Sequence, residues 1–451
     1  IRRFYNQEHY IITTDPLSIP TNFLTPIKIN DYAEIPSYID QLVNIKKNAE
    51  EEKNPEKKLL LEQLKASKKE KEAHEKELNK EKDKNKRQAL LLKREANNRF
   101  RTGLKHHQAK EYLEAAKEYK AATELKPEYS EAYISWGIAL DDIAETKSRN
   151  EAEELYKEAC KKYNLATKYK KDYHKVYFIW GLNLSLIAVT KSGCEAEELY
   201  EEACKKYDEA TTYKQDYHEA YYYWGTALME LAKTKSGSEA EELYKEAFEK
   251  YNLATTYKKD KHEAYYNWAN ALMELAETKS GSEAEELYKE AFEKYNLATT
   301  YKQDDHEAYN NWGNVLGDLA QTKSGSEAEE LYKEACEKYK LATTYKKDKH
   351  EAYYNWGITL VELAKTKSGS EAEELHKEAF KKYNLAFKYG GGAYNLACLY
   401  AIRNQKAEAL KYLDIALSRN EITINFVEQD EDWKNLRNDP DFQDLLSRYK
   451  K

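Results

Sequence analysis

The sequence predicts an all-helical solenoid, in which paired antiparallel helices stack side by side into a long array. One observation is a tryptophan that recurs every 44 residues through six copies of one motif. Another is that apolar residues within each copy fall three or four positions apart, the spacing of one helix face. In addition, 15 glycines and 7 prolines in 451 residues are too few for an architecture of many strands and turns. The recurring residues are Trp136, Trp180, Trp224, Trp268, Trp312 and Trp356.

Each 44-residue copy is expected to form two helices. In residues 262–305 the first helix carries Trp268 on its apolar stripe and ends near Gly281, which can take a left-handed conformation there. Ser282 and Glu285 then have the spacing of a capping box that begins the second helix. Neither helix has enough partner surface alone, so each pair has to pack on its neighbours. We therefore expect the tryptophans to be buried between repeats.

Residues 96–129 resemble the tetratricopeptide repeat (TPR), a family of 34-residue helix pairs. The 44-residue copies are similar to it but have longer helices, with Trp where the family usually has Leu and Ala269 in place of a small Gly. The resemblance implies a right-handed superhelix whose concave inner face is formed by the first helices. The matching positions of the short copy are Ala96, Gly103, Tyr112, Ala115, Tyr119, Ala122 and Pro127.

Four regions are expected along the chain. Residues 1–44 contain strand-like runs and four prolines, as in the tail of an α/β-like domain or an irregular segment. Residues 45–95 are a charged helical linker or coiled-coil-like arm. Residues 96–389 hold seven TPR-like repeats, the first of 34 residues and the others of 44. Residues 390–451 are a degenerate last repeat and a C-terminal cap, which a solenoid needs to close its end.

A partner-binding surface is expected on the inner face, by analogy with the family. An acidic residue recurs at one inner position and favours a basic or neutral protein or peptide over an acidic one. Tyrosine offers flat contact area, and asparagine pairs with both donors and acceptors of a peptide backbone. The alternative is that the helix surfaces are polar and tyrosine-rich throughout the chain. The candidates are Glu219, Tyr222, Glu263, Tyr266, Asn270, Glu307, Asn310, Asn314, Glu351 and Tyr354.

An apolar cluster is expected at inner positions of two earlier repeats, where the other copies have polar residues. Exposed apolar clusters mark contact sites, so this cluster is a second candidate for partner binding. The equal alternative is cover from within the chain, by the charged N-terminal helix or residues 1–44. Its members are Ile134, Ile138, Phe178, Leu182 and Leu186.

The sequence offers no catalytic, cofactor or metal site. It lacks the phosphate-binding loop, the dinucleotide fingerprint, the zinc-protease motif and the nucleophile elbow. One histidine begins each long repeat from His174 to His350. Helices pack about 8–10 Å apart, too far for such residues to share an ion whose ligands lie roughly 2 Å away.

Charge and composition bound the partners and the compartment. A net charge of −8 and the acidic inner positions oppose nucleic-acid binding. No apolar run approaches the roughly 20 residues of a membrane helix. Five cysteines, none at C-x-x-C spacing, favour a reducing cytoplasm over a disulfide framework or a zinc site.

These observations predict a non-catalytic scaffold that binds a peptide or protein through the concave face of a TPR-like superhelix. It needs no cofactor, and a homo-oligomer is compatible with the fold. The alternative is a sensor or oligomerisation arm of a larger multidomain signalling or defence enzyme, whose catalytic domain lies upstream of residue 1.

Overall fold

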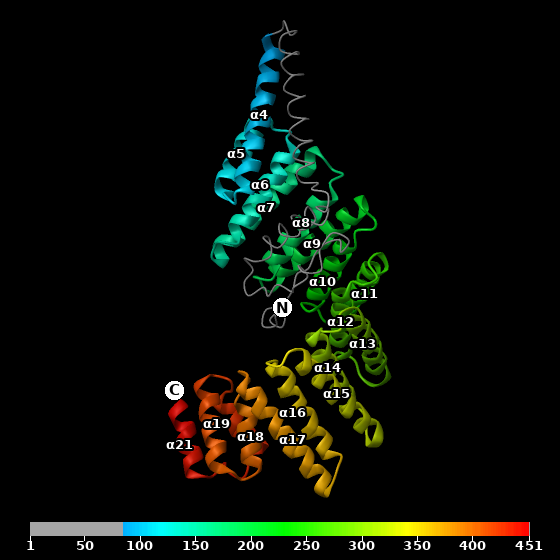
Figure 1. Ribbon diagram of the computed structural model, residues 1–451, viewed down its shortest axis with the longest axis vertical. Coiled ribbons are helices and arrows are strands. Elements are labelled where there is room, and N and C mark those ends of the chain that lie inside the picture. The colour runs from blue at the N-terminus through cyan, green and yellow to red at the C-terminus, as the bar shows by residue number, and fades with distance from the viewer. Residues whose placement is uncertain (1–83, 451) are drawn as a thin grey trace. The chain divides into compact units, whose positions relative to one another are not determined.

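The computed structural model describes residues 84–450, and every regular element in that range is a helix (Figure 1). The predicted all-α array of paired helices is therefore confirmed. The expected segment 1–44 and most of the expected arm 45–95 lie outside the described residues. Residues 84–95 form the first turns of helix α4. The chain divides into two compact units, Ile1–Lys259 and Asp260–Lys451.

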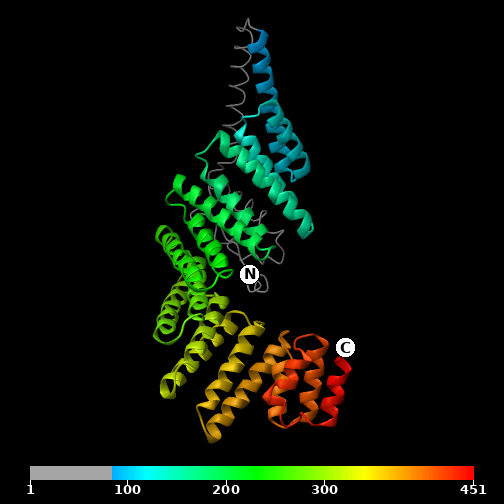
Figure 2. The same ribbon diagram turned by 180° about the vertical axis from the view of Figure 1, so that it is seen from behind.

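The first unit, in its described part, is a row of four helix pairs. In each of its three long pairs a first helix of 15 residues is followed by a second helix of 20 or 21 residues. Figure 2 shows these pairs from behind, each beside the next. The helices are α4 (Lys84–Gln108), α5 (Tyr112–Leu125), α6 (Ser130–Ala144), α7 (Arg149–Tyr169), α8 (His174–Ala188), α9 (Cys194–Tyr213), α10 (His218–Ala232) and α11 (Gly237–Tyr257).

The second unit continues with three long pairs and then shorter helices, coloured orange to red in Figure 1. The shorter helices have their own apolar core, in which Trp433 and Phe442 are fully buried. The elements are α12 (His262–Ala276), α13 (Gly281–Tyr301), α14 (His306–Gln321), α15 (Gly325–Tyr345), α16 (His350–Lys365), α17 (Gly369–Lys388), α18 (Tyr394–Ile402), α19 (Lys406–Ser418), α20 (Ile424–Gln429), η4 (Glu431–Trp433) and α21 (Pro440–Tyr449).

In each of these helix pairs, a tyrosine on the second helix packs against a small residue on the first helix. A Cβ added to Gly225 would lie 2.8 Å from the ring of Tyr251, and one added to Gly313 would lie 2.6 Å from the ring of Tyr339. Side chains larger than glycine therefore require the ring to move. Ala269 takes this position in α12, where it is fully buried.

The recurring tryptophans are buried, as expected, with at most 9% of the surface of Trp180, Trp224, Trp268, Trp312 or Trp356 exposed. Trp136, in the first long repeat, is partly buried. A lysine from the second helix of the same repeat lies over each indole ring, at 3.1–4.1 Å from the ring centre. Cation–π attraction therefore reinforces apolar burial in all six long repeats.

The loop between the two helices of a repeat differs from the expectation. Gly281 does have a left-handed φ of 61°, but it is the first residue of α13, and Ser280 is its N-cap. The capping box expected from Ser282 and Glu285 is wrong. The Glu285 carboxylate instead accepts from Lys289 on its own helix and from Lys323 of the next repeat, both at 2.6 Å. Two charged partners outweigh one backbone N–H.

Candidate protein-binding surface

An asparagine on the first helix of one repeat is hydrogen-bonded to its own repeat and to the next. In α12, Asn270 Oδ1 accepts from the Tyr295 hydroxyl at 2.6 Å and from Asn311 Nδ2 at 3.2 Å. Tyr295 is fully buried, so this bond satisfies a hydroxyl that water cannot reach. Asn311 belongs to α14 of the following repeat.

The same arrangement recurs one repeat later. Asn314 Oδ1 accepts from the Tyr339 hydroxyl at 3.0 Å and from Asn355 Nδ2 at 2.8 Å. We call Asn270, Asn311, Asn314 and Asn355 the amide ladder. It joins α12, α14 and α16 and fixes which way the Asn270 and Asn314 carboxamides point.

The amide ladder uses the carboxamide oxygens of Asn270 and Asn314 but not their NH2 groups. The oxygen of each carboxamide, Asn270 and Asn314, accepts two bonds, but the NH2 groups donate to no other described residue. Both side chains are partly exposed. Two donors on neighbouring repeats are therefore held in a fixed orientation and available to a ligand.

Aromatic and apolar side chains flank these donors. Tyr266 and Tyr354 are partly exposed, and each packs edge-on against the buried tyrosine of its own repeat. The Tyr266 hydroxyl accepts from Asn311 Nδ2 at 3.0 Å. Ile358 occupies the ladder position in α16 and is 37% exposed. The inner positions of this unit thus combine polar donors with apolar contact area.

Asn310 lies inside the ladder and not on an accessible surface. Only 1% of its surface is exposed. Its Nδ2 donates to Asn311 Oδ1 at 3.2 Å, and its Oδ1 accepts from Asn355 Nδ2 at 3.4 Å. The expectation that Asn310 contacts a partner is therefore wrong, because the neighbouring asparagines enclose it.

The acidic positions of the second unit are largely compensated by basic neighbours. Lys349 is buried and reaches Glu307 at 2.7 Å and Glu351 at 3.4 Å. Glu263 lies 3.2 Å from His262 and 3.4 Å from Lys261. Burial would raise the pKa of Glu263, but His262 and Lys261 lower it to about 2. Lys261 and Lys349 were not considered in the sequence analysis, although each directly precedes a recurring histidine, His262 or His350.

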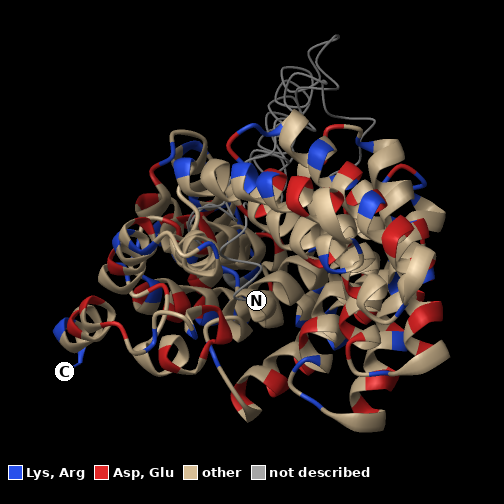
Figure 3. Ribbon diagram, turned by 90° about the horizontal axis from the view of Figure 1, so that it is seen from below, with Lys and Arg blue, Asp and Glu red and all other residues tan. Residues whose placement is uncertain are grey.

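Mixed charge is also visible over the helices as a whole, where Lys and Arg alternate with Asp and Glu (Figure 3). Many of these side chains form pairs three or four residues apart on one helix, such as Lys289 with Glu285. Such alternation gives no single-sign field to attract a highly charged ligand.

Two candidates in the first unit are buried. Glu219 lies next to His218, with 3.4 Å between charged atoms, and 6% of its surface is exposed. Tyr222 is 7% exposed and packs edge-on against Tyr223, 4.9 Å between ring centres. Neither side chain offers an open contact surface, which corrects the expectation for both.

The expected apolar cluster is likewise not exposed. Phe178 contacts the rings of Tyr207, Tyr217 and Tyr223 from the two helices that follow it. Leu186 belongs to a buried core between consecutive repeats. Phe178 is thus covered partly by the next repeat, and Leu186 packs with the preceding one. The alternative of cover by the N-terminal helix or residues 1–44 stays a prediction. The buried members are Ile134, Phe178, Leu182 and Leu186, while Ile138 is partly exposed.

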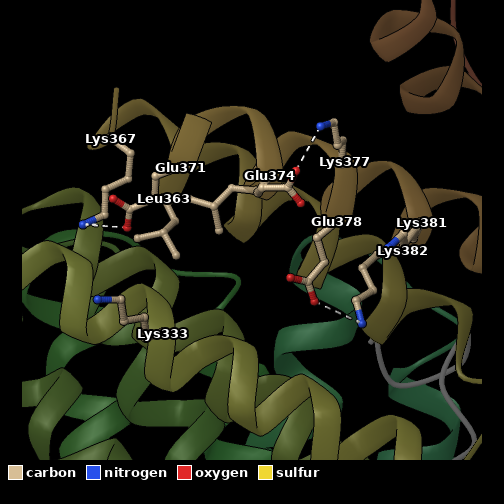
Figure 4. Close-up of a pocket in the computed structure, with 10 residues that line it drawn as sticks. Lys333, Leu363, Lys367, Glu371, Glu374, Lys377, Glu378, Lys381 and Lys382 are labelled. Atoms are coloured by element: carbon tan, nitrogen blue, oxygen red, sulfur yellow. Dashed lines mark hydrogen bonds and ion pairs between the residues drawn. The ribbon is translucent and has the colours of Figure 1, made fainter. Parts of the chain in front are cut away.

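A groove that the sequence did not reveal recurs between second helices. In the first unit it has a volume of about 590 Å³, and Trp224, Leu231 and Leu243 line it. Three repeats later a groove of about 330 Å³ uses the equivalent Leu363 and Leu375 (Figure 4). Lysines and glutamates form both rims. The signal was present in the leucines that recur every 44 residues.

One group of described residues brings metal-ligand atoms together: Cys398, Asp430 and Asp432, whose ligand atoms lie within 4.8 Å of one another. Asp430 is already occupied, since Oδ2 accepts from the Tyr394 hydroxyl at 2.7 Å and Oδ1 accepts from the Asp432 N–H at 3.0 Å. Burial and Asp430 raise the pKa of the Cys398 thiol. A hydrogen-bonded cap at the start of η4 accounts for this cluster.

The other cysteines are unpaired thiols. Burial raises the pKa of Cys336 to about 12 and also raises the pKa values of Cys160 and Cys204. These three thiols are therefore packing groups and not activated nucleophiles. Cys194 is exposed and is the first residue of α9.

The glycine–tyrosine contact of the long repeats is the one found in the short TPR-like copy, where a Cβ added to Gly103 would lie 2.6 Å from the Tyr119 ring. The described chain is an array of TPR-like helix pairs. No helix among the described residues is long and apolar enough to cross a membrane.

Comparison with protein families gives a match over part of the chain. The profile of the family described as plant specific mitochondrial import receptor subunit TOM20 matches residues 196–310 and, overlapping them, residues 292–395. Together the two matches span less than half of the chain. A search of curated protein sequences finds no significant match.

Solved structures with a similar architecture include several TPR proteins. The C-terminal part of a TPR repeat-containing protein from Cytophaga hutchinsonii is 11% identical, with a TM-score of 0.47, over 64% of this chain and 99% of that one. PilF of Pseudomonas aeruginosa is 14% identical, with a TM-score of 0.36, over 64% and 99%. YrrB, described as a TPR protein with an unusual peptide-binding site, is 20% identical, with a TM-score of 0.34, over 50% and 96%.

Proposed function

We propose that the chain is a protein-interaction scaffold that binds an extended peptide segment of a partner along α12, α14 and α16. The observation that carries the proposal is the pair of carboxamide NH2 groups on Asn270 and Asn314. The amide ladder orients both groups and leaves both without an acceptor among the described residues. Backbone carbonyl oxygens of an extended peptide are the acceptors that such donors suit.

The surroundings of the two donors favour a neutral, partly apolar segment. Tyr266 and Tyr354 add flat contact area at low rotamer cost, and Ile358 adds an exposed apolar contact. The nearby acids Glu307 and Glu351 are bridged by Lys349, which reduces their pull on a basic partner. A neutral segment therefore fits this surface better than a strongly basic one.

The family match supports a protein-binding role. It covers residues 196–395, which include α12 to α16, and its description names a receptor subunit. The expected cytoplasmic location, the expected lack of catalysis and the alternative of an arm on a larger enzyme stay predictions.

Substituting Asp for Asn tests the two donors selectively. The Asn270→Asp/Asn314→Asp double variant keeps an oxygen that accepts from the buried tyrosine and the next asparagine, but it lacks the NH2 donors. Random peptides displayed on phage and selected on the full chain would supply the ligands, and fluorescence anisotropy would measure their affinity. We expect the double variant to bind at least about tenfold more weakly, the loss for one or two hydrogen bonds.

Asn296→Asp is the matched control, because Asn296 is an exposed residue on the second helix α13. It introduces one negative charge away from the ladder, against two in the double variant, and should leave affinity unchanged. Selection of no peptide, or equal affinity for the double variant and the control, would contradict the proposal.

A further inference from the structure

The last long repeat of the second unit is followed by a short one. Helix α18 begins at Tyr394, 44 residues after His350 begins α16, so the two helices start in register. Helix α16 has 16 residues, whereas α18 has 9 and ends at Ile402. The counterparts of residues 359–365 are therefore missing from the helix that follows α17.

In the preceding repeat, the residues that α18 lacks make a specific packing contact. At the end of α16, Leu363 packs with Ala328 and Tyr332, which belong to the first turns of α15. All three are buried. In the first unit Ile187, which has the place of Leu363, packs in the same way with Ala152 and Tyr156 of α7. The end of each first helix thus covers the start of the preceding second helix.

On α17 the equivalent positions are uncovered. Ala372 corresponds to Ala328, and His376 corresponds to Tyr332. Ala328 and Tyr332 are 3% and 5% exposed, whereas Ala372 and His376 are only partly buried. The described part of the chain provides no counterpart of Leu363 to pack on them.

An ion pair is missing at the same place. In four junctions a lysine that follows a first helix reaches a glutamate on the preceding second helix, whose side chain is 12–26% exposed. Glu373 is the corresponding residue of α17. It is 69% exposed and, among the described residues, reaches only Lys377 of its own helix, at 3.3 Å. The four pairs are Glu153 with Lys191, Glu197 with Lys235, Glu285 with Lys323, and Glu329 with Lys367, at 2.5–2.8 Å.

A hollow of about 480 Å³ lies beside these residues. Glu373 and His376 line it from α17, Leu399 and Ile402 line it from α18, and Arg403 lines it just after α18 ends. Ile402 is 50% exposed. We call Ala372, Glu373, His376 and Ile402 the α17 ledge. The ledge offers an apolar floor beside a carboxylate whose counterparts in other repeats bind a lysine.

We propose that the α17 ledge docks an amphipathic helix of a partner protein, which supplies the contacts that a further long repeat would have made. The ends of the other first helices indicate which sequence pattern the ledge would bind. They end in two apolar residues three positions apart, such as Leu360 and Leu363, with a lysine four residues after the second, such as Lys367. The partner helix is expected to carry the same pattern.

A second copy of this chain is a poorer occupant. Its own helix ends with this pattern are engaged, since Lys191, Lys235, Lys323 and Lys367 each reach a glutamate of the preceding repeat. The apolar end of α6, at Ile143, is also buried. A second copy would therefore have to open its own array before it could dock.

A peptide with the sequence of residues 359–368, which leaves out the part whose place α18 fills, is a direct probe when it is cross-linked to stabilise its helix and fluorescently labelled. Anisotropy with the full chain should show saturable binding. Glu373→Lys should weaken it at least about tenfold, since it replaces attraction by repulsion. A peptide carrying Lys367→Glu should recover affinity for the Glu373→Lys chain.

Three controls make the result decisive. Glu337→Lys adds the same charge at an exposed position of α15 and should bind as the native chain does. The Asn270→Asp/Asn314→Asp chain should also bind the probe normally, which separates the ledge from the inner face. Circular dichroism melting should show that Glu373→Lys remains folded.

Absence of saturable binding, or equal affinity for the native and Glu373→Lys chains, would overturn the proposal. Sedimentation velocity of the chain alone gives a further check. If it showed self-association that Glu373→Lys abolishes, the ledge would belong to a second copy, and the proposal of a separate partner helix would fail.

Discussion

Two glycines on α14 lie four residues apart and differ in what surrounds them. A Cβ at Gly313 would lie 2.6 Å from the buried Tyr339 ring, while one at Gly317 would meet only Thr359 Oγ1, at 3.8 Å. Gly313→Ala should therefore destabilise the unit by about 1–2 kcal/mol through overpacking. Gly317→Ala should stabilise it by up to about 1 kcal/mol, because alanine favours the helix more than glycine does.

Urea unfolding followed by circular dichroism would compare the two variants. Ala269 occupies the Gly313 position in α12, so a shift of the tyrosine ring can accommodate a methyl group, and the cost should stay at the low end of the overpacking range. Equal changes in the free energy of unfolding for both variants would contradict the role assigned to the tyrosine ring.

At the residue scale, the sequence identified which side chains are buried within a repeat more reliably than which are exposed on the inner face. Periodicity placed Trp268 and its equivalents in the core, because that assignment depends on neighbours three or four residues away. Asn310 was misjudged because its cover comes from Asn355, 45 residues further on. Glu285 was misjudged for the same reason, since Lys323 lies 38 residues further on.

The start of α16 links the stability of this element to pH. Burial would raise the pKa of Glu351, but the hydrogen bond with His350 and the charge of Lys349 lower it to about 2. An unfolded glutamate titrates near ~4.3. As the pH falls, the unfolded chain therefore takes up this proton first. The contribution of Glu351 to stability is present above about pH 4.3 and is lost as the pH approaches about 2.

Glu351→Gln should flatten the acid limb of the stability curve. Thermal unfolding between pH 5.5 and 2.5 should show a smaller decrease in stability for this variant than for the native chain. Glu337→Gln, at an exposed position that pairs with Lys340, provides the comparison. Parallel acid limbs for the native chain and Glu351→Gln would show that the pKa of Glu351 is not lowered on folding.

At the element scale, the sequence predicted the number and order of the long helix pairs because the 44-residue period marks each one. The loop chemistry was less accessible. The sequence analysis placed Ser280 and Gly281 at the end of the first helix. Backbone geometry instead makes Ser280 the N-cap and Gly281 the first residue of the second helix, α13. The length of α18 follows from the loss of the long-repeat pattern after residue 389, and its consequence for α17 needed the packing of the other junctions.

At the scale of the whole molecule, stability is expected to be local, because each repeat contacts mainly its neighbours. The shorter helices α18 to α21 share a core of their own, centred on Trp433 and Phe442, whose rings stack with centres 5.1 Å apart. Trp433→Ala should remove about 3–5 kcal/mol from this region, as for other fully buried aromatic residues. The first unit has a separate core and should be unaffected.

Hydrogen exchange followed by mass spectrometry would map the effect along the chain. We expect faster exchange in α18 to α21, a smaller change in α17 and native protection in α6 to α11. The same loss of protection in α6 to α11 would mean that the two units unfold as one cooperative body. If the Trp433→Ala chain kept native protection in α6 to α11 but no longer bound the probe at the α17 ledge, the ledge would belong to the same cooperative region as the C-terminal helices.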